Sequence, residues 1–353
     1  MDATLKGLGF EQSAHEHAIY GRSHGGARLL VGVYVDDLVI TGSNTGEIDR
    51  FKHEMKERFL MSDLGLLSFY LGIEVSQGSG GIKLCQSAYA KKILETAGML
   101  NCNPAATPME TRLKLSRNST ADEVDATAYR RLIGSLRYLV HTRPDITFAV
   151  GYLSRFMERP TVEHMGAVKR LLRYIAGTLT YGLEYKRGAG EAKLVGYSDS
   201  DHAGDIDTRR STSGALFFLG SSLISWQSTK QRIVALSSCE AEYVAAATAA
   251  TQAIWLARLL GELKGTETSI VRLKMDSMSA LALSKNPVFH ERSKHIDLRY
   301  HFIRECVDNG SIAAEFVTTK DQLADILTKA LERVKFQEMR SKIGMIKVED
   351  HKG

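Results

Sequence analysis

Residues 193–199, KLVGYSD, decide how the second half of the chain is organised. Apolar and polar side chains alternate along this stretch, as they do in a strand with one buried face. A hairpin around Gly220, a long apolar helix from Ser237, and two more strands separated by helices follow it. The expected strands are 193–198, 215–219, 223–227, 270–275 and 313–317. A run of strands and then alternating helix and strand predicts an α/β (α+β) fold, with a mixed five-stranded sheet flanked by helices.

Acidic residues stand at the ends of these elements. Asp199 and Asp276 each follow directly after an expected strand. Glu242 lies one turn into the long helix, and Asp325 lies in an expected closing helix that starts at Thr319. Because the ends of neighbouring strands meet at one edge of an α/β sheet, we expect these carboxylates to converge.

Clustered carboxylates repel one another and raise one another's pKa unless cations neutralise them. An all-oxygen set of ligands favours Mg²⁺ or Mn²⁺ over zinc. Two such ions about 4 Å apart can activate water and stabilise the leaving oxygen of a phosphodiester. The alternative for each acid is a solvated cap or turn residue. That alternative fits Glu240 best, because Ser237 and Glu240 have capping-box spacing, whereas Glu242 has no such local task.

Residues 29–41, LLVGVYVDDLVIT, organise the first half of the chain. An apolar run interrupted by Asp36 and Asp37 predicts a strand, a turn and a second strand. A helix over about 45–59 and another hairpin over 69–86 are expected to follow.

The middle of the chain is helical in pattern and basic in charge. A polar linker is expected over 104–125, and helices over 126–180. Residues 128–187 hold eleven Lys and Arg against four Asp and Glu, an excess of +7, whereas the whole chain has +5. Lys169, Arg170 and Arg173 lie on one of these helices. They form either a solvated helix face or a surface that tracks a phosphate backbone with salt-dependent affinity.

Three other classes are disfavoured. The four cysteines show no CxxC spacing, which argues against a zinc ribbon or a disulfide framework and fits a reducing compartment. His290, His295 and His301, even with Cys306, do not match a structural zinc pattern. No apolar run approaches 18 residues, so we expect no membrane-spanning segment.

An ordered series of short strings resembles the reverse transcriptase and ribonuclease H part of Ty1/copia-type retrotransposon Pol proteins. The strings in the second half are Tyr197-Ser-Asp-Ser-Asp-His-Ala-Gly-Asp205, Ser211-Thr-Ser-Gly214, Ser225-Trp226, Ser237-Ser-Cys-Glu-Ala-Glu-Tyr243, Asp276-Ser277, Ser293-Lys-His-Ile-Asp-Leu-Arg-Tyr-His301-Phe-Ile-Arg-Glu305 and Asp321-Gln-Leu-Ala-Asp-Ile-Leu-Thr-Lys329. In the first half, Tyr34-Val-Asp-Asp37 and residues 64–74 resemble the metal-binding turn and a later hairpin of a polymerase palm.

The resemblance implies a division of the chain. Residues 1–110 would be the C-terminal part of a reverse transcriptase palm, and residues 111–190 a helical thumb or connection. Residues 191–335 would be a ribonuclease H-like domain, and residues 336–353 a C-terminal tail.

The resemblance also implies chemistry. Two Mg²⁺ or Mn²⁺ ions would be held by Asp199, Glu242, Asp276 and Asp325 to cut RNA in RNA–DNA hybrids, with Asp201 and Asp205 as neighbouring loop groups. Asp36 and Asp37 would be metal ligands of a polymerase remnant. The implied partners are hybrid, template–primer and other Pol or Gag-derived proteins, with no membrane. The implied location is the cytoplasm, within virus-like particles for an active element, or the nucleus.

The first half departs from the family pattern in one respect. Polymerisation needs a third aspartate from an earlier palm strand, and the 35 residues before Asp36 contain no apolar strand with a suitable acid. We therefore expect the C-terminal part of a Pol protein, with a complete nuclease and an incomplete polymerase. Two alternatives stay open: a catalytically inactive nucleic-acid-binding relic, and a truncated gene model of a full reverse transcriptase.

Overall fold

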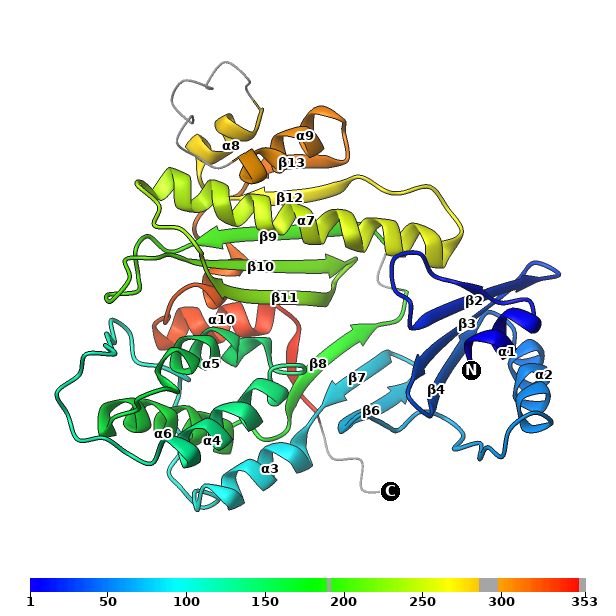
Figure 1. The fold of residues 1–353 in the computed structure, drawn as a ribbon, viewed down its shortest axis with the longest axis horizontal. Helices are drawn as coiled ribbons and strands as arrows, with labels where there is room; N and C mark the ends of the chain where they lie inside the picture. Colours follow the sequence, from blue (N-terminus) through cyan, green and yellow to red (C-terminus); the bar gives the residue numbers. More distant parts are fainter. Residues whose placement is uncertain (189–191, 286–297, 349–353) are drawn as a thin grey trace. The chain divides into compact units, whose positions relative to one another are not determined.

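The computed structural model describes residues 1–188, 192–285 and 298–348. The chain separates into two compact units (Figure 1). Unit 1 comprises Met1–Leu67 and Ile254–Ser269, and unit 2 comprises Ser68–Ala253 and Ile270–Gly353.

Unit 1 contains an antiparallel sheet with the strand order β1-β2-β3-β4. Its elements are α1 (Asp2–Gly7), β1 (Glu11–Gln12), β2 (Ile19–His24), β3 (Ala27–Tyr34), β4 (Asp37–Gly42) and α2 (Thr45–Lys56). The predicted strand, turn and strand are confirmed, because Tyr34 of β3 pairs with Asp37 of β4. Asn44 caps α2 by accepting hydrogen bonds from the next backbone amides, and Phe51 of that helix is fully buried.

Unit 2 contains two sheets, the first of which is antiparallel with the order β14-β8-β7-β6-β5. Its strands are β5 (Phe69–Tyr70), β6 (Ile73–Gly78), β7 (Gly81–Cys85), β8 (Tyr181–Lys186) and β14 (Met345–Lys347). The hairpin predicted over 69–86 is present, and its strand β7 continues the sheet by pairing with β8. Residues 336–348, within the expected C-terminal tail, hold most of α10 (Arg333–Lys342), whose Phe336 and Met339 are buried, and also β14 (Met345–Lys347).

Helices fill the middle of unit 2. They are α3 (Ser87–Thr96), α4 (Ala126–Leu139), α5 (Thr147–Leu153) and α6 (Val162–Ala176), with short 3₁₀ turns at Pro144–Ile146 and Ser154–Phe156. Those within 126–180 were predicted from the sequence, whereas α3 was not. Their buried side chains share one hydrophobic core with Leu216, Phe218 and Leu223 of the second sheet. The helices therefore pack on that sheet and bury part of its apolar surface.

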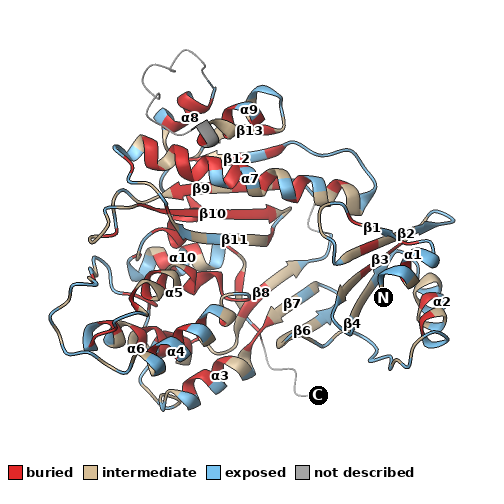
Figure 2. Ribbon diagram, viewed as in Figure 1, coloured by how far each residue is buried: buried red, intermediate tan, exposed pale blue. Residues whose placement is uncertain are grey.

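The second sheet of unit 2 has five strands in the order β11-β10-β9-β12-β13. They are β9 (Leu194–Ser200), β10 (Thr212–Leu219), β11 (Ser222–Lys230), β12 (Val271–Met275) and β13 (Ile312–Phe316). The first three strands are antiparallel, whereas β12 is parallel to both β9 and β13. This is the mixed five-stranded sheet with flanking helices that the sequence predicted, and Figure 2 shows how thoroughly β9 and β10 are buried.

The remaining helices connect these strands. They are α7 (Ser238–Lys264), α8 (Met278–Lys285), α9 (Phe302–Asp308) and the 3₁₀ helices Leu298–His301 and Leu323–Leu327. The expected closing helix from Thr319 is wrong. Gln322 instead caps the Leu323–Leu327 turn through its own side chain.

Helix α7 is long and apolar enough to cross a membrane by length and composition alone. Its most apolar window is 56% buried within the protein, and Gln252 of this helix donates a hydrogen bond to Ser225 of β11. These contacts are those of a core helix packed on a sheet.

Candidate metal centre

Three of the predicted carboxylates meet at one edge of the second sheet. Asp199 lies near the end of β9 and Asp276 directly follows β12, so the parallel pairing of these strands brings the two residues together. Glu242 reaches the same place from the first turns of α7. One carboxylate oxygen from each of the three residues lies within 4.8 Å of the others.

Asp199 is 2% exposed, and Thr328 donates a hydrogen bond to its Oδ2 atom. Burial raises the pKa of Asp199 to about 6, with Lys329 opposing the rise and the acids Asp325 and Asp276 adding to it. The carboxyl group is therefore held in an environment that disfavours its charge until a cation arrives.

Glu242 shows the same conflict in stronger form. Its Oε1 atom accepts a hydrogen bond from the Ser200 amide at 3.1 Å, whereas its buried Oε2 atom has no hydrogen-bond partner among the described residues. Burial raises the pKa of Glu242 to about 9, and Asp199 and Asp276 add to the rise. A buried carboxylate oxygen without a donor, beside two further acids, fits a hard divalent cation.

Asp325 is fully buried and lies in the 3₁₀ helix rather than in an α-helix. Its Oδ1 atom is 2.6 Å from the Lys329 ammonium, and its Oδ2 atom accepts a hydrogen bond from Lys335. It does not belong to the group of three oxygens, although it is close enough to raise the pKa of Asp199. Two lysines thus neutralise this carboxylate in the structure, and its role as a fourth metal ligand stays a prediction.

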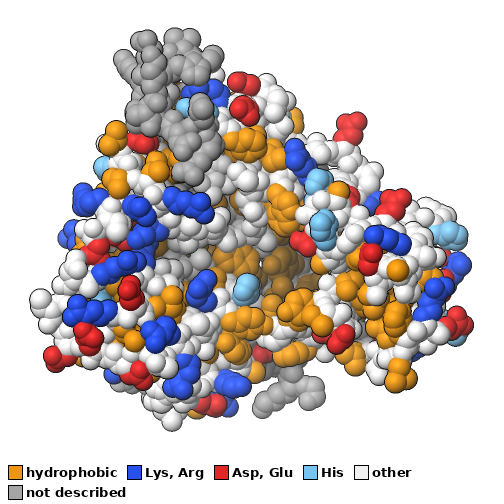
Figure 3. Space-filling view, viewed as in Figure 1, with side chains coloured by type: hydrophobic (Ala, Val, Ile, Leu, Met, Phe, Trp, Pro, Cys, Tyr) orange, Lys and Arg blue, Asp and Glu red, His pale blue; other side chains and the backbone are white. Residues whose placement is uncertain are grey.

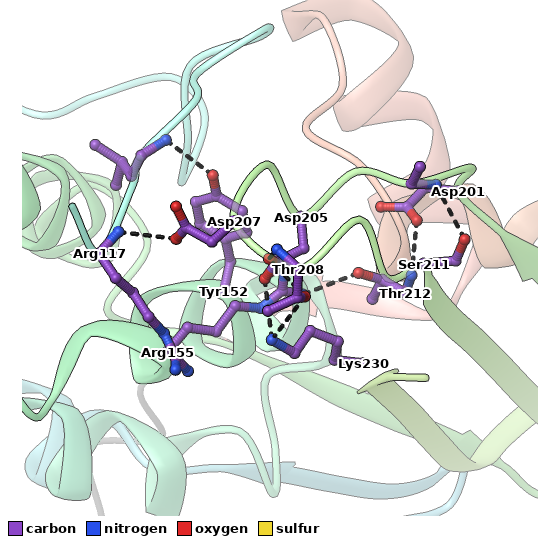
Figure 4. A network of polar contacts seen from close by, with 12 residues as sticks. Arg117, Tyr152, Arg155, Asp201, Asp205, Asp207, Thr208, Ser211, Thr212 and Lys230 are labelled. Carbon is purple, nitrogen blue, oxygen red and sulfur yellow. Dashed lines mark hydrogen bonds and ion pairs between the residues drawn. The ribbon is translucent and has the colours of Figure 1, made fainter. Parts of the chain in front are cut away.

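The loop after Asp199 is fixed by a polar network (Figure 4). Asp205 is 6% exposed and forms ion pairs with Arg155 at 3.2 Å and Lys230 at 3.1 Å. Although its burial alone would raise the pKa, hydrogen bonds from Thr208 and Lys230 lower the pKa of Asp205 to about 2. Asp201 accepts a hydrogen bond from the Thr212 amide. Both acids therefore have loop-fixing partners, as expected.

Many Lys and Arg side chains gather over the helical part of unit 2 (Figure 3), and the basic residues of α6 have individual contacts. Arg170 forms an ion pair with Glu110 at 3.0 Å, and Arg173 donates to the Asn103 carbonyl at 2.7 Å. Lys169 is exposed. Two of the three cations therefore hold the 103–110 segment, and contact with a phosphate backbone stays a prediction for all three.

Asp36 and Asp37 are exposed at the turn between β3 and β4 in unit 1. Val35 in this turn has a φ of 52°, in the left-handed region that a β-branched residue rarely enters. Among residues 1–188, 192–285 and 298–348, no third His, Cys, Asp or Glu lies close enough to these two acids to form a metal site with them.

The histidines give no zinc site in the part of the chain that is described. His301 shares a hydrogen bond with Tyr243 at 3.0 Å, and Cys306 is buried. His290 and His295 lie outside the described residues.

Sequence reasoning missed several groups around the carboxylates. Thr328, Lys329 and Lys335 all contact Asp199 or Asp325, and Gln231 contacts residues beside Asp199 and Glu242. Thr328 and Lys329 lie within residues 321–329, one of the segments that resemble the Pol family, so this resemblance could have indicated that they belong near the site. Gln231 and Lys335 stand in no such pattern.

Comparisons with known proteins agree with the sequence strings. The family model described as reverse transcriptase (RNA-dependent DNA polymerase) matches residues 1–111. The Pol polyprotein from transposon RE2 of Arabidopsis thaliana is 42% identical over 341 residues, covering 97% of this chain and 23% of that protein. The putative transposon Ty5-1 protein of Saccharomyces cerevisiae is 32% identical over 246 residues, covering 69% of this chain and 80% of that protein.

Among solved structures, the N-terminal RNase H domain of a Mycobacterium tuberculosis protein is 15% identical and covers 42% of this chain and 97% of that one. Its TM-score of 0.28 is too low to add to the topology described above. The chain spans about a quarter of the length of the Pol polyproteins it matches. The sequence matches are decisive, and they show that this chain belongs to the copia-type retrotransposon Pol family.

Proposed function

We propose that residues 191–335 act as a metal-dependent ribonuclease H that hydrolyses the RNA strand of RNA–DNA hybrids. The observation that carries the proposal is the convergence of Asp199, Glu242 and Asp276, whose oxygens lie within 4.8 Å of one another. A hydrolase that cleaves phosphodiesters with Mg²⁺ or Mn²⁺ needs such a set of hard oxygen ligands to hold the ions.

Each residue has a distinct task in this proposal. Asp199 and Asp276 would hold the ions, and the Oε2 atom of Glu242, which has no hydrogen-bond partner among the described residues, would supply a further ligand. When bound, the ions would activate water and stabilise the leaving oxygen. Thr328 fixes the orientation of the Asp199 carboxylate through its hydrogen bond. Asp325 completes the set if an ion replaces its lysine partners.

The proposed substrate is recognised by shape. Hybrids present 2′-hydroxyl groups and phosphates across a wide minor groove, so we expect no base-sequence preference. Lys169, Arg170 and Arg173 are the proposed backbone contacts, and their loss should reduce the salt dependence of hybrid binding.

Cleavage of a labelled RNA–DNA hybrid in Mg²⁺ by the full chain tests the proposal. Removing one charged metal ligand should lower the rate by at least about 100-fold, because the site then has one negative charge fewer and holds the ion less firmly in position. Asp276→Asn is the test variant, and Asp308→Asn, an exposed acid on α9, is the matched control. Equal cleavage by wild type and Asp276→Asn contradicts the proposal. Hybrid binding without any cleavage by the wild type supports the inactive relic instead.

Asp36 and Asp37 support a second, narrower proposal. The reverse transcriptase family model covers them, and their turn contains the strained Val35 backbone that functional sites often retain. We propose that they are palm metal ligands, and that this chain by itself does not extend a primer because no third acid joins them among the described residues. If the wild type extends a primer and Asp36→Asn does not, the proposal that this chain by itself does not extend a primer is contradicted.

We also propose partners and a location. The chain would act beside other Pol or Gag-derived proteins in the cytoplasm, inside virus-like particles when its element is active, or in the nucleus. The family membership supports this placement. Fractionation of cells expressing a tagged chain tests it, and recovery of the chain with membranes contradicts it.

A further inference from the structure

Gln231 is a buried, uncharged side chain beside the carboxylates. It follows the last residue of β11 and is 6% exposed. Its Nε2 atom faces three acceptors: the Ala241 carbonyl at 2.8 Å and the hydroxyls of Ser213 and Ser200 at 3.0 and 3.2 Å. Its backbone amide donates to the Ser211 carbonyl at 2.7 Å. One residue is therefore bonded to three separate elements.

Two of these elements carry the metal-binding acids. Ser200 directly follows Asp199 in β9, and Ala241 directly precedes Glu242 in α7. The Ser200 amide in turn donates to Glu242. The Gln231 carboxamide thus closes a small ring of hydrogen bonds that joins the strand of one acid to the helix of the other.

This connection opposes a repulsion. Asp199 and Glu242 carry like charges when ionised, and their mutual repulsion tends to move the start of α7 away from β9. The ring resists this movement without adding charge to the site, because the carboxamide is neutral. The Arg155–Asp205 network of Figure 4 fixes the neighbouring loop, so the two sets of bonds act on different parts of the edge.

We propose that Gln231 is a positioning residue that sets the spacing of Asp199 and Glu242, and thereby the metal affinity of the centre. The inference rests on the proposed metal-dependent function. Groups that orient metal ligands from outside the ligand set change metal affinity by about 10- to 100-fold when they are lost. A residue that only stabilises the fold would leave the affinity of the folded protein unchanged.

Mn²⁺ binding to the full chain, measured by titration calorimetry after chelation and dialysis, tests the inference. Gln231→Met keeps the size of the side chain but removes the donor, and it should weaken Mn²⁺ binding by about 10-fold or more. Gln86→Met is the matched control. This substitution removes another buried glutamine, which directly follows β7 and accepts a hydrogen bond from Thr142. The Gln86→Met protein should bind Mn²⁺ like the wild type.

Hybrid cleavage gives a second readout. Because the ligands themselves remain, saturating Mn²⁺ should restore most of the rate of Gln231→Met but not that of Asp276→Asn. If Gln231→Met does not fold, Ser200→Ala takes its place. This change removes the ring acceptor on β9 but keeps the Ser200 backbone amide that donates to Glu242, and it should weaken Mn²⁺ binding by about threefold, the value of one modest hydrogen bond.

The outcomes separate the two proposals. Wild type that binds no Mn²⁺, or Asp276→Asn that binds it equally well, overturns the metal centre itself. If Asp276→Asn loses binding while folded Gln231→Met retains wild-type affinity, only the role of Gln231 is overturned. Where Gln231→Met does not fold, wild-type affinity in Ser200→Ala has the same meaning.

Discussion

Glu242 combines burial, like-charged neighbours and an oxygen without a hydrogen-bond donor. In the metal-free protein these conditions favour its protonated form at neutral pH, whereas the pKa of Asp199, raised to about 6, favours protonation of that group only below about pH 6. A divalent ion must displace these protons when it binds, so metal affinity should fall as the pH is lowered. The raised pKa values of Glu242 and Asp199 therefore predict tighter metal binding at neutral to alkaline pH than at acidic pH.

The same shifts predict how stability depends on pH. The pKa of Glu242 rises from an ordinary 4.5 to about 9, and that of Asp199 from 3.8 to about 6. At pH values between the ordinary pKa and the raised pKa of each group, the folded state binds more protons than the unfolded state. The free energy of unfolding therefore falls as pH rises through this window. In EDTA, thermal unfolding should therefore move to lower temperature between pH 5 and pH 8.

The matching variant is Glu242→Gln, which cannot ionise. At pH 8 in EDTA it should exceed the wild type in free energy of unfolding by at least about 1 kcal/mol. The difference should shrink at pH 5 and also when Mn²⁺ is added to the wild type. A wild-type melting temperature in EDTA that rises steadily from pH 5 to pH 8, with Glu242→Gln following it, would contradict the assignment of these shifts.

At the scale of elements, the loop 201–212 depends on a neighbour from the helical segment. Arg155 follows α5, and it donates both to Asp205 in the loop and to Thr212 at the start of β10. Both side chains of the ion pair are at least nine-tenths buried. Losing one partner of a buried pair leaves the other charge uncompensated, which costs more than an exposed pair contributes.

Arg155→Met should therefore lower the free energy of unfolding by about 2–4 kcal/mol, because Asp205 keeps only Lys230 as a cation. Hydrogen exchange of the 201–212 amides should accelerate in the same variant. Arg159→Met is the control, since the Arg159–Glu123 pair is more than half exposed and should change stability by less than about 1 kcal/mol. Equal effects of the two substitutions would show that the buried pair has no special role.

Local sequence patterns predicted the elements that carry the proposed metal-binding acids. Alternation along 193–199 and the strand-like segment 270–275 before Asp276 each predict a strand whose end places an acid, and these signals are local. The position of Asp325 was less predictable, because its 3₁₀ helix and its pairing with Lys335 depend on packing that no local pattern records. The contacts of Gln231 could not be predicted for the same reason, because its acceptors lie 10 to 31 residues away in the chain.

At the scale of the molecule, the sheet β11-β10-β9-β12-β13 shares its core with the helices that precede it. Leu216, Phe218 and Leu223 are buried in the same cluster as side chains of α4, α5 and α6. The predicted borders at 190 and 335 stay a prediction, but cutting the chain there exposes this apolar surface to water. Pairing of β14 with β8, across more than 150 residues, was likewise beyond any local signal.

A fragment of residues 191–335 should therefore be much less stable than the full chain. Burial of each of these three large apolar side chains contributes about 1.5–3 kcal/mol. Their summed contribution is comparable with the net stability of a small domain. We expect the fragment to lack a cooperative thermal transition and to aggregate in size-exclusion chromatography, whereas the full chain melts cooperatively in unit 2. A monomeric fragment with the melting temperature of the full chain would contradict the shared core.

The sheet that joins β14 to β8 has a consequence for how the protein is made. Its last strand ends at Lys347, so a ribosome must release nearly the whole of unit 2 before this sheet can close. Until then, the β8 edge that β14 will cover is open to pairing with other nascent chains. Synthesis from crowded polysomes is therefore the stage at which this protein should depend on chaperones.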